Sequence, residues 1–150
     1  MREILFRGKR KDNGEWVYGS LIALDNDNEF VYICPKYEYA SSMTISELIS
    51  CCLCSVDPET VGQYTGLTDK NGNKIFEGDI LKCLTDDFVG TVIYNKNTAS
   101  FIVEIKNSNS EFFHYSSLNK GDITRPLQLQ ETESVGNIHD NAELLEMQDD

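Results

Sequence analysis

The stretch TGLTDKNGNKIFEGDILK, residues 65–82, holds three glycines, three acidic residues and an Asn-Gly pair in eighteen positions. This density of turn-forming residues is too high for a helix. The side chain of Asp69 can accept hydrogen bonds from backbone amides two residues on, and Asn71 and Gly72 tolerate positive φ. The stretch therefore predicts a turn at residues 69–72, with Gly66 closing the strand before it.

A second turn is predicted at Glu77-Gly78-Asp79, directly before the apolar pair Ile80-Leu81. Gly78 can adopt dihedral angles that other residues avoid, and Asp79 can cap backbone amides. We expect Gly66, Asp69, Asn71, Gly72, Glu77, Gly78 and Asp79 to be structural turn residues.

A calcium loop is the alternative for this stretch, because Asp69, Asn71 and Asn73 alternate as calcium ligands do. An EF-hand loop needs glycine at its sixth position and glutamate at its twelfth. Here glycine is fourth and Ile80 is twelfth. The spacing excludes an EF-hand.

Four apolar segments follow, DILKCL, VGTVIY, SFIVEI and FFHYSSL, separated by the polar turns TDDF, NKNTA and KNSNSE. Short strands with short loops bury their apolar face best by curling into a small barrel. The sequence predicts a mainly β protein with a compact barrel over residues 75–131, whose core includes Ile80, Leu81, Val92, Ile93, Phe101 and Val103.

The N-terminal part also reads as β structure. In REILFRGKRKDNGEWVYGSLIAL, two apolar segments flank Asn13-Gly14, a pair that is typical of a two-residue type I′ hairpin turn. FVYICP, residues 30–35, predicts a third strand that ends at proline.

The segment from Ser41 to Cys54 allows both helix and strand. Thr44 and Glu47 have the spacing of a helix capping box, whereas LISCCLCSV has the apolar density of a strand. The sequence allows a short helix followed by a strand and does not decide between helix and strand for residues 41–50.

Five cysteines, an odd number, fit a reducing compartment. Cys51 and Cys54 form a Cys-x-x-Cys motif, but the other candidate ligands, Cys34, Cys83, His114 and His139, are scattered singly. A zinc site needs a second closely spaced pair, and a redox motif needs a βαβ context. We expect buried strand cysteines that bind no metal, and no cofactor.

Composition points to an ordinary domain of 150 residues that carries a net charge of −12. This charge repels nucleic acid on average, so nucleic acid is an unlikely partner unless a local patch overrides it. That patch would be Arg2, Arg7, Lys9, Arg10 and Lys11. No apolar run suits a membrane span or a signal peptide, so a cytoplasmic protein without membrane contact is expected.

Three segments, FRGKRKDNGEWVYGSL, VDPETVGQYTGLTDKNGNKIFEGDILK and ESVGNIHDNAELLE, together resemble the YopX family of phage and prophage proteins. The resemblance spans nearly the whole chain, although Ala142 stands where the family often has proline. The positions that fall on the family's central signature are Thr65, Gly66, Leu67, Asp69, Asn71, Gly72, Ile75, Glu77, Gly78, Asp79 and Ile80.

The resemblance implies a smaller N-terminal β region, residues 1–63, and an SH3-like barrel with a C-terminal tail and a short terminal helix, residues 64–150. It implies no biochemical activity.

Catalytic motifs are not found in the sequence. His114 and His139 have no nucleophile motif beside them, and phosphate-binding and dinucleotide motifs are missing. We therefore expect a protein without catalytic residues.

Three classes of function stay open. The first is a non-catalytic module that binds a host or phage protein. Its possible partner surface is aromatic and comprises Trp16, Tyr64, Phe76, Tyr94 and Tyr115. The second is a nucleic-acid-associated protein that uses the basic N-terminal hairpin, with Trp16 and Tyr18 as stacking residues. The third is a carboxylate-dependent enzyme. The sequence predicts neither the partner nor the oligomeric state.

Overall fold

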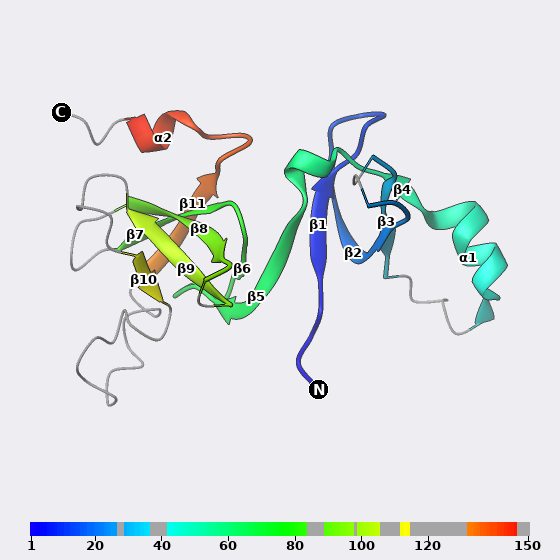
Figure 1. The fold of residues 1–150 in the computed structure, drawn as a ribbon, viewed down its shortest axis with the longest axis horizontal. Coiled ribbons are helices and arrows are strands. Elements are labelled where there is room, and N and C mark those ends of the chain that lie inside the picture. The colour runs from blue at the N-terminus through cyan, green and yellow to red at the C-terminus, as the bar shows by residue number, and fades with distance from the viewer. Residues whose placement is uncertain are drawn as a thin grey trace. The chain divides into compact units, whose positions relative to one another are not determined.

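The computed structural model describes residues 1–26, 29–36, 42–83, 89–97, 99–105, 112–114 and 132–146, without the side chains of 83, 105 and 112–114. This described part is mainly β and comprises two antiparallel sheets and two α-helices. Figure 1 shows how these elements follow one another along the chain. In the described part of the chain, no helix has the length and apolar content needed to cross a membrane.

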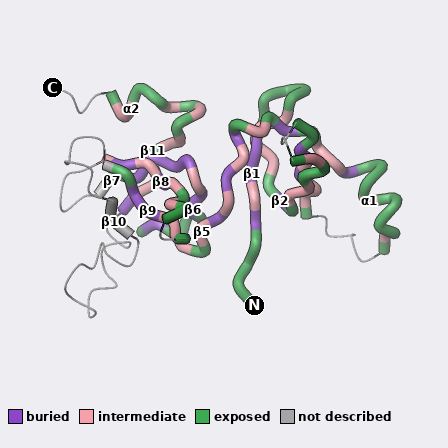
Figure 2. Tube along the Cα trace, in the orientation of Figure 1, coloured by how far each residue is buried: buried purple, intermediate pink, exposed green. Residues whose placement is uncertain are grey.

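The chain divides into two compact units, Met1–Tyr64 and Thr65–Asp150. Buried residues follow the strands of each unit, whereas helix α1 is mostly exposed (Figure 2).

The first unit is built on antiparallel strands β1 (Phe6–Lys9), β2 (Trp16–Ala23), β3 (Val31–Pro35) and β4 (Cys54–Ser55), together with the start of β5 (Gly62–Thr68). Their order is β4-β3-β2-β1-β5. One face of this sheet holds the core: buried Val31, Ile33 and Val56, against which Phe6, Val17, Leu21 and Val61 pack. The three predicted N-terminal strands are confirmed.

The turn between β1 and β2 differs from the prediction. Gly14 has φ 72°, but Asn13 is not among the described residues with positive φ, so the turn is not type I′. Arg10 N donates to Glu15 O and Gly14 N donates to Arg10 O, both at 2.9 Å, and these bonds close a longer loop over residues 11–14. The Asn-Gly pair located the hairpin but not its turn type.

Helix α1 (Ile45–Cys52) decides the segment that the sequence left open, apart from Ser41, which lies outside the described residues. Its capping box is present: Glu47 N donates to Thr44 Oγ1 at 3.3 Å, and Thr44 N donates to Glu47 Oε2 at 2.7 Å. The short 3₁₀ turn η2 (Pro58–Thr60) then leads into β5.

The second unit contains β6 (Lys74–Phe76), which pairs with β5, and a separate five-stranded antiparallel sheet. That sheet has the order β10-β9-β8-β7-β11 and consists of β7 (Asp79–Cys83), β8 (Val89–Asn95), β9 (Ser100–Ile105), β10 (Phe112–His114) and β11 (Thr132–Asn137). Helix α2 (Glu143–Glu146) is the expected short terminal helix.

The expected core of this unit is largely confirmed. Ile80, Leu81, Val92 and Val103 are fully buried, and Val92 faces Val103 across β8 and β9. Phe101 is only partly buried and packs against this cluster. Ile93 is half-buried because it follows Val92 and points to the opposite face of the strand.

Strand β11 was not predicted from the sequence, and its residues were expected to belong to the C-terminal tail. It pairs with β7, so the described strands form an open five-stranded sheet, and neither sheet closes into a barrel among the described residues. Much of the expected barrel segment, residues 106–111 and 115–131, lies outside the described part of the chain.

Candidate functional site

Asp69, at the centre of the opening stretch, is buried and accepts hydrogen bonds on both carboxylate oxygens. Its Oδ1 accepts from Asn71 N and Asn73 N, both at 2.9 Å. Its Oδ2 accepts from Asn73 Nδ2 at 3.2 Å and from Ser134 N at 3.1 Å. Through these hydrogen bonds, the carboxylate connects its own turn to strand β11.

Burial acts to raise the pKa of Asp69, but the hydrogen bonds from Ser134, Asn73 and Asn71 outweigh it and hold the pKa below its ordinary value. A carboxylate kept ionised by four N–H donors has little capacity left to bind a metal or to accept a proton from a substrate. Asp69 is thus a structural anion.

Further contacts join this turn to β11. Lys70 N donates to Thr132 O at 3.0 Å, and the Lys70 ammonium lies 3.6 Å from a carboxylate oxygen of Glu133. Asn71 Nδ2 donates to the other oxygen of Glu133 at 3.3 Å. A segment more than sixty positions away in sequence is therefore fastened to the 69–73 turn.

The second turn is also structural. Asp79 is buried, and its Oδ2 accepts from Phe76 N at 2.8 Å. Gly78 has φ 88°, donates its N–H to Val92 O at 2.8 Å and accepts from Ile138 N at 2.9 Å. Glu77 is half-buried beside them. The chain needs glycine here because the left-handed backbone is unfavourable for residues with a Cβ.

Two details of the first turn differ from the prediction. Gly66 does not close a strand but lies inside β5 with φ 88°, a left-handed kink of the kind found at bulges. Gly72 has φ 80°, whereas Asn71 is not among the described residues with positive φ. One glycine is therefore enough for the turn.

The C-terminal GNIHDN segment is a further turn. Asn137 Oδ1 accepts from His139 N and Asp140 N, both at 3.0 Å. The side chain of Asn141 accepts from Asn137 N at 3.3 Å, and a Cβ at Gly136 would collide with that side chain. This motif leads β11 into α2.

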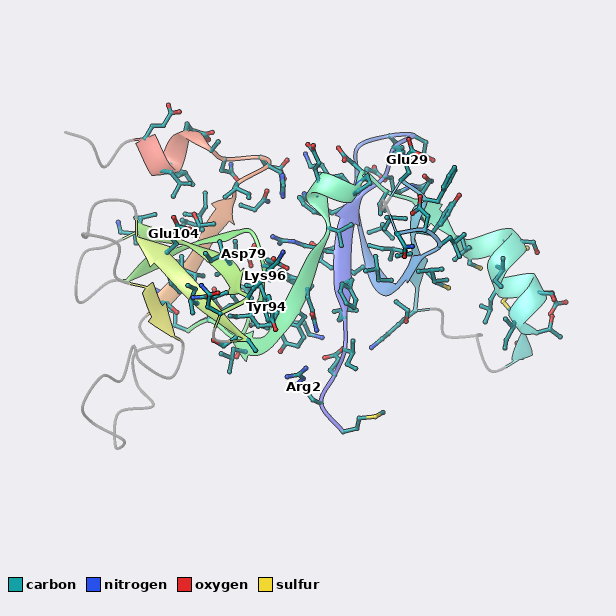
Figure 3. The ribbon with its side chains drawn as sticks, in the orientation of Figure 1. Arg2, Glu29, Asp79, Tyr94, Lys96 and Glu104 are labelled. Carbon is teal, nitrogen blue, oxygen red and sulfur yellow. The ribbon has the colours of Figure 1, made fainter. Side chains whose placement is uncertain are left out.

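The aromatic residues proposed as a partner surface lie in different environments. Tyr64 and Phe76 are buried, so neither ring is available to a partner. Tyr94, which is labelled in Figure 3, is 45% exposed. Its ring packs edge-on against that of Phe101, with the ring centroids 5.3 Å apart. Tyr115 lies outside the described residues.

Trp16 is half-buried and lies close to two cations. The guanidinium carbon of Arg7 is 4.8 Å from the ring centroid, and the Lys9 ammonium is 5.5 Å from it. Both distances are within the range of cation–π attraction. Trp16 and Tyr94 are therefore the described members of the predicted surface that reach solvent.

Helix α1 carries an exposed apolar surface that the sequence analysis did not single out. Ile45 is 75% exposed and Ile49 is 51% exposed, Leu48 is half-buried, and Cys52 alone is buried. These four residues have the spacing of one helical stripe, which we call the α1 stripe. The signal was present in the sequence once the capping box fixed the helix.

The cysteines differ from the expected buried strand residues. Cys51 and Cys52 lie on α1, where Cys51 is exposed, while Cys34 and Cys54 are half-buried in strands. Burial, followed by the neighbouring thiols of Cys52 and Cys54, raises the pKa of Cys34. Among the residues with described side chains, no three His, Cys, Asp or Glu side chains are grouped as a metal site requires. The absence of metal stays a prediction.

Comparison with known proteins gives a family match and a structural match. The model of the YopX protein family matches residues 5–146. No curated protein matches the chain. Among solved structures, the chain resembles the crystal structure of protein EF1440 from Enterococcus faecalis, with a TM-score of 0.51, 20% sequence identity, and coverage of 97% of this chain and 99% of that chain. At this identity the likeness concerns the fold alone.

Proposed function

The chain belongs to the YopX family, and from this premise we propose that it is a non-catalytic module that acts by binding another protein. The observation that carries the proposal is the α1 stripe. A short helix that leaves two isoleucines largely in solvent gains little stability from them within its own chain. Apolar residues gathered on one exposed helix face are typical of docking surfaces.

The arrangement of the signature residues is consistent with a non-catalytic role. The carboxylates of Asp69 and Asp79 accept hydrogen bonds from backbone amides, and the glycines beside them satisfy backbone geometry. These structural roles account for the presence of these residues without a catalytic role.

The finer parts of the proposal follow from the family. The protein would be a phage- or prophage-encoded accessory protein that works in the cytoplasm on a host or phage protein. The sheet of the second unit would belong to an SH3-like barrel, for which the consecutive antiparallel pairing of β7, β8, β9 and β10 is the support.

The proposal is tested by affinity capture from host lysate with three forms of the full chain. These are the wild type, Ile45→Glu/Ile49→Glu, and the control Ser46→Glu/Ser50→Glu, which adds the same charge to the polar side of α1. We expect a protein that the wild type and the control retain and that the isoleucine variant loses. Equal retention by all three forms, or no retained protein, would contradict it.

A further inference from the structure

The β2–β3 hairpin ends in two exposed apolar side chains. Leu24 N donates to Phe30 O at 3.1 Å, which continues the register in which Ala23 faces Val31. Leu24 and Phe30 are therefore directly opposite each other, and their side chains point to the same side of the sheet. Leu24 is 68% exposed and Phe30 is 55% exposed. The end of the hairpin thus presents an aliphatic and an aromatic side chain together to solvent.

Two further residues extend this surface along the strands. Ile22 and Tyr32 are register partners, and each is two positions from an exposed residue of its own strand, so they belong to the same side of the sheet. Both are half-buried. Val31, between Phe30 and Tyr32 in sequence, belongs to the buried cluster of the first unit on the opposite side. We call Ile22, Leu24, Phe30 and Tyr32 the β2–β3 patch.

The patch is the accessible part of its side of the sheet. Near β1 and β5 that side is covered, because Leu5, Arg7 and Tyr64 are buried there. The strand order β4-β3-β2-β1-β5 places the β2–β3 hairpin away from β5. Exposure rises along β2 from half-buried Ile22 to Leu24 at its end. Single exposed apolar residues are common on proteins, whereas neighbouring large ones are typical of interaction sites.

The loop that joins the two strands is acidic. Its sequence DNDNE, residues 25–29, contains three acidic residues and no basic residue. The carboxylate of Asp25 accepts from Glu29 N and from Phe30 N, each at 3.3 Å, and so holds the start and the end of the loop together beside the patch. Glu29, which is labelled in Figure 3, is exposed. The apolar patch therefore has a negatively charged rim.

We propose that the β2–β3 patch binds a basic amphipathic segment of a partner protein. Apolar side chains of that segment cover Leu24 and Phe30, and its lysines or arginines lie against Asp25 and Glu29. The apolar contacts supply affinity, while the acidic rim selects a cationic partner and speeds the encounter. The net charge of −12 acts in the same direction at longer range.

The same charges argue against other occupants. Nucleic acids and anionic lipid surfaces are repelled, and a second copy of this chain would bring two acidic loops together. The β2–β3 patch shares no residue with the α1 stripe, so this proposal is independent of the proposed function.

The probe is a short synthetic amphipathic helix of leucine and lysine that carries a fluorescent label. Its binding to the full chain is followed by fluorescence anisotropy at low and at higher salt. We expect saturable binding that weakens as salt is added. Two peptides of the same length are controls: a leucine–glutamate helix reverses the charge, and oligolysine lacks the apolar face. Neither should bind at concentrations that saturate the leucine–lysine helix.

Two double variants locate the binding site. Leu24→Thr/Phe30→Thr removes the apolar contacts but keeps residues that favour strands, and it should weaken binding about tenfold or more. Ile45→Thr/Ile49→Thr removes two exposed apolar side chains from α1 and should leave binding unchanged. A loss in the α1 variant alone would overturn this proposal and assign the peptide to the α1 stripe, which leaves the proposed function intact.

A second pair of variants tests the acidic rim. Glu29→Lys should weaken binding about threefold, the size of an exposed ion pair, and should reduce its dependence on salt. Glu104→Lys makes the same charge change at an exposed residue of the second unit and should leave binding unchanged. Thermal unfolding verifies that each variant is folded before it is titrated.

Three results would overturn the proposal. They are equal losses in the two double variants, equal losses in the two lysine variants, and binding of oligolysine as tight as that of the leucine–lysine helix. Sedimentation equilibrium adds a fourth: a dimer of the wild type that Leu24→Thr/Phe30→Thr abolishes would assign the patch to a second copy of the chain instead.

Discussion

Gly78 is a single residue that connects three segments, namely its own turn, strand β8 and the C-terminal segment. Its φ of 88° is unfavourable for any residue with a Cβ, and its backbone joins β8 through Val92 and the C-terminal segment through Ile138. Gly78→Ala is therefore expected to lower the free energy of unfolding by about 1 kcal/mol or more. Urea unfolding followed by circular dichroism measures the loss.

Gly72→Ala is the comparison for Gly78→Ala. Gly72 also has positive φ, but a Cβ there would meet no atom within 4 Å, so this variant isolates the backbone cost. An unchanged melting temperature for Gly78→Ala would show that the glycine serves another purpose.

Asp69 links stability to pH. Its folded pKa lies below the ordinary value of 3.8, so its contribution is complete above pH 3.8 and is lost as the pH falls through the folded pKa. Asp69→Asn replaces an acceptor oxygen with an amide group that faces N–H donors. We expect the variant to lose about 1–3 kcal/mol of unfolding free energy at pH 7.

The difference between wild type and Asp69→Asn should shrink as the pH is lowered below about 4, because the protonated aspartate no longer stabilises the fold. Denaturant unfolding at a series of pH values measures this trend. Asp12→Asn is the control, since Asp12 is exposed and its ion pair with Arg10 lies at the surface, where such pairs contribute little to stability. A difference that stays constant with pH would contradict the role given to Asp69.

At the scale of elements, helix α1 depends on its cap more than on packing. Cys52 is its single buried residue, so the Thr44–Glu47 capping box supplies much of what holds the helix. Thr44→Ala should cost about 1 kcal/mol locally. We expect faster hydrogen exchange of the α1 amides with little change in the melting temperature.

Ser46→Ala, within the same helix, leaves the Thr44–Glu47 capping box intact and should leave the exchange of α1 close to that of the wild type. If Thr44→Ala lowered the melting temperature of the whole protein strongly, α1 would be coupled to the core, contrary to its exposure.

The elements also show which features a sequence can predict. Local signals were informative: alternating apolar residues predicted β7, β8 and β9. Thr44 and Glu47 mark the start of α1, although the sequence left helix and strand open for that segment. The predicted type I′ turn was wrong because hydrogen bonds of Arg10 with Glu15 and Gly14 fix a longer loop that contains the Asn-Gly pair.

Features that depend on distant partners were not predictable. TESVGN has few apolar residues, and its strand structure in β11 comes from pairing with β7 and from the bond between Ser134 and Asp69. Tyr64 was placed in the partner surface, but its position in β5 buries it. The burial of an aromatic ring cannot be predicted from the sequence until the neighbouring strands are known.

At the scale of the whole molecule, each unit contains its own buried cluster. Ile33 is central to the first and Val103 to the second. Ile33→Ala should cost about 2–5 kcal/mol and raise hydrogen exchange mainly in residues 1–64. Val103→Ala, the reciprocal control, should raise it mainly in residues 65–146. Equal effects of both variants on all described segments would show one cooperative fold instead of two.

The bond between Asp69 and Ser134 also bears on how the protein is made. Its partners are 65 positions apart, whereas the strands of the first unit pair within the first 64 residues. On the ribosome, the first unit can therefore assemble while the rest is still being translated. Until β11 is synthesised, the nascent chain carries β7 with one side unpaired, an edge that invites aggregation. A premature stop codon before residue 132 would leave that edge open for the lifetime of the product, so such truncated chains should be chaperone clients.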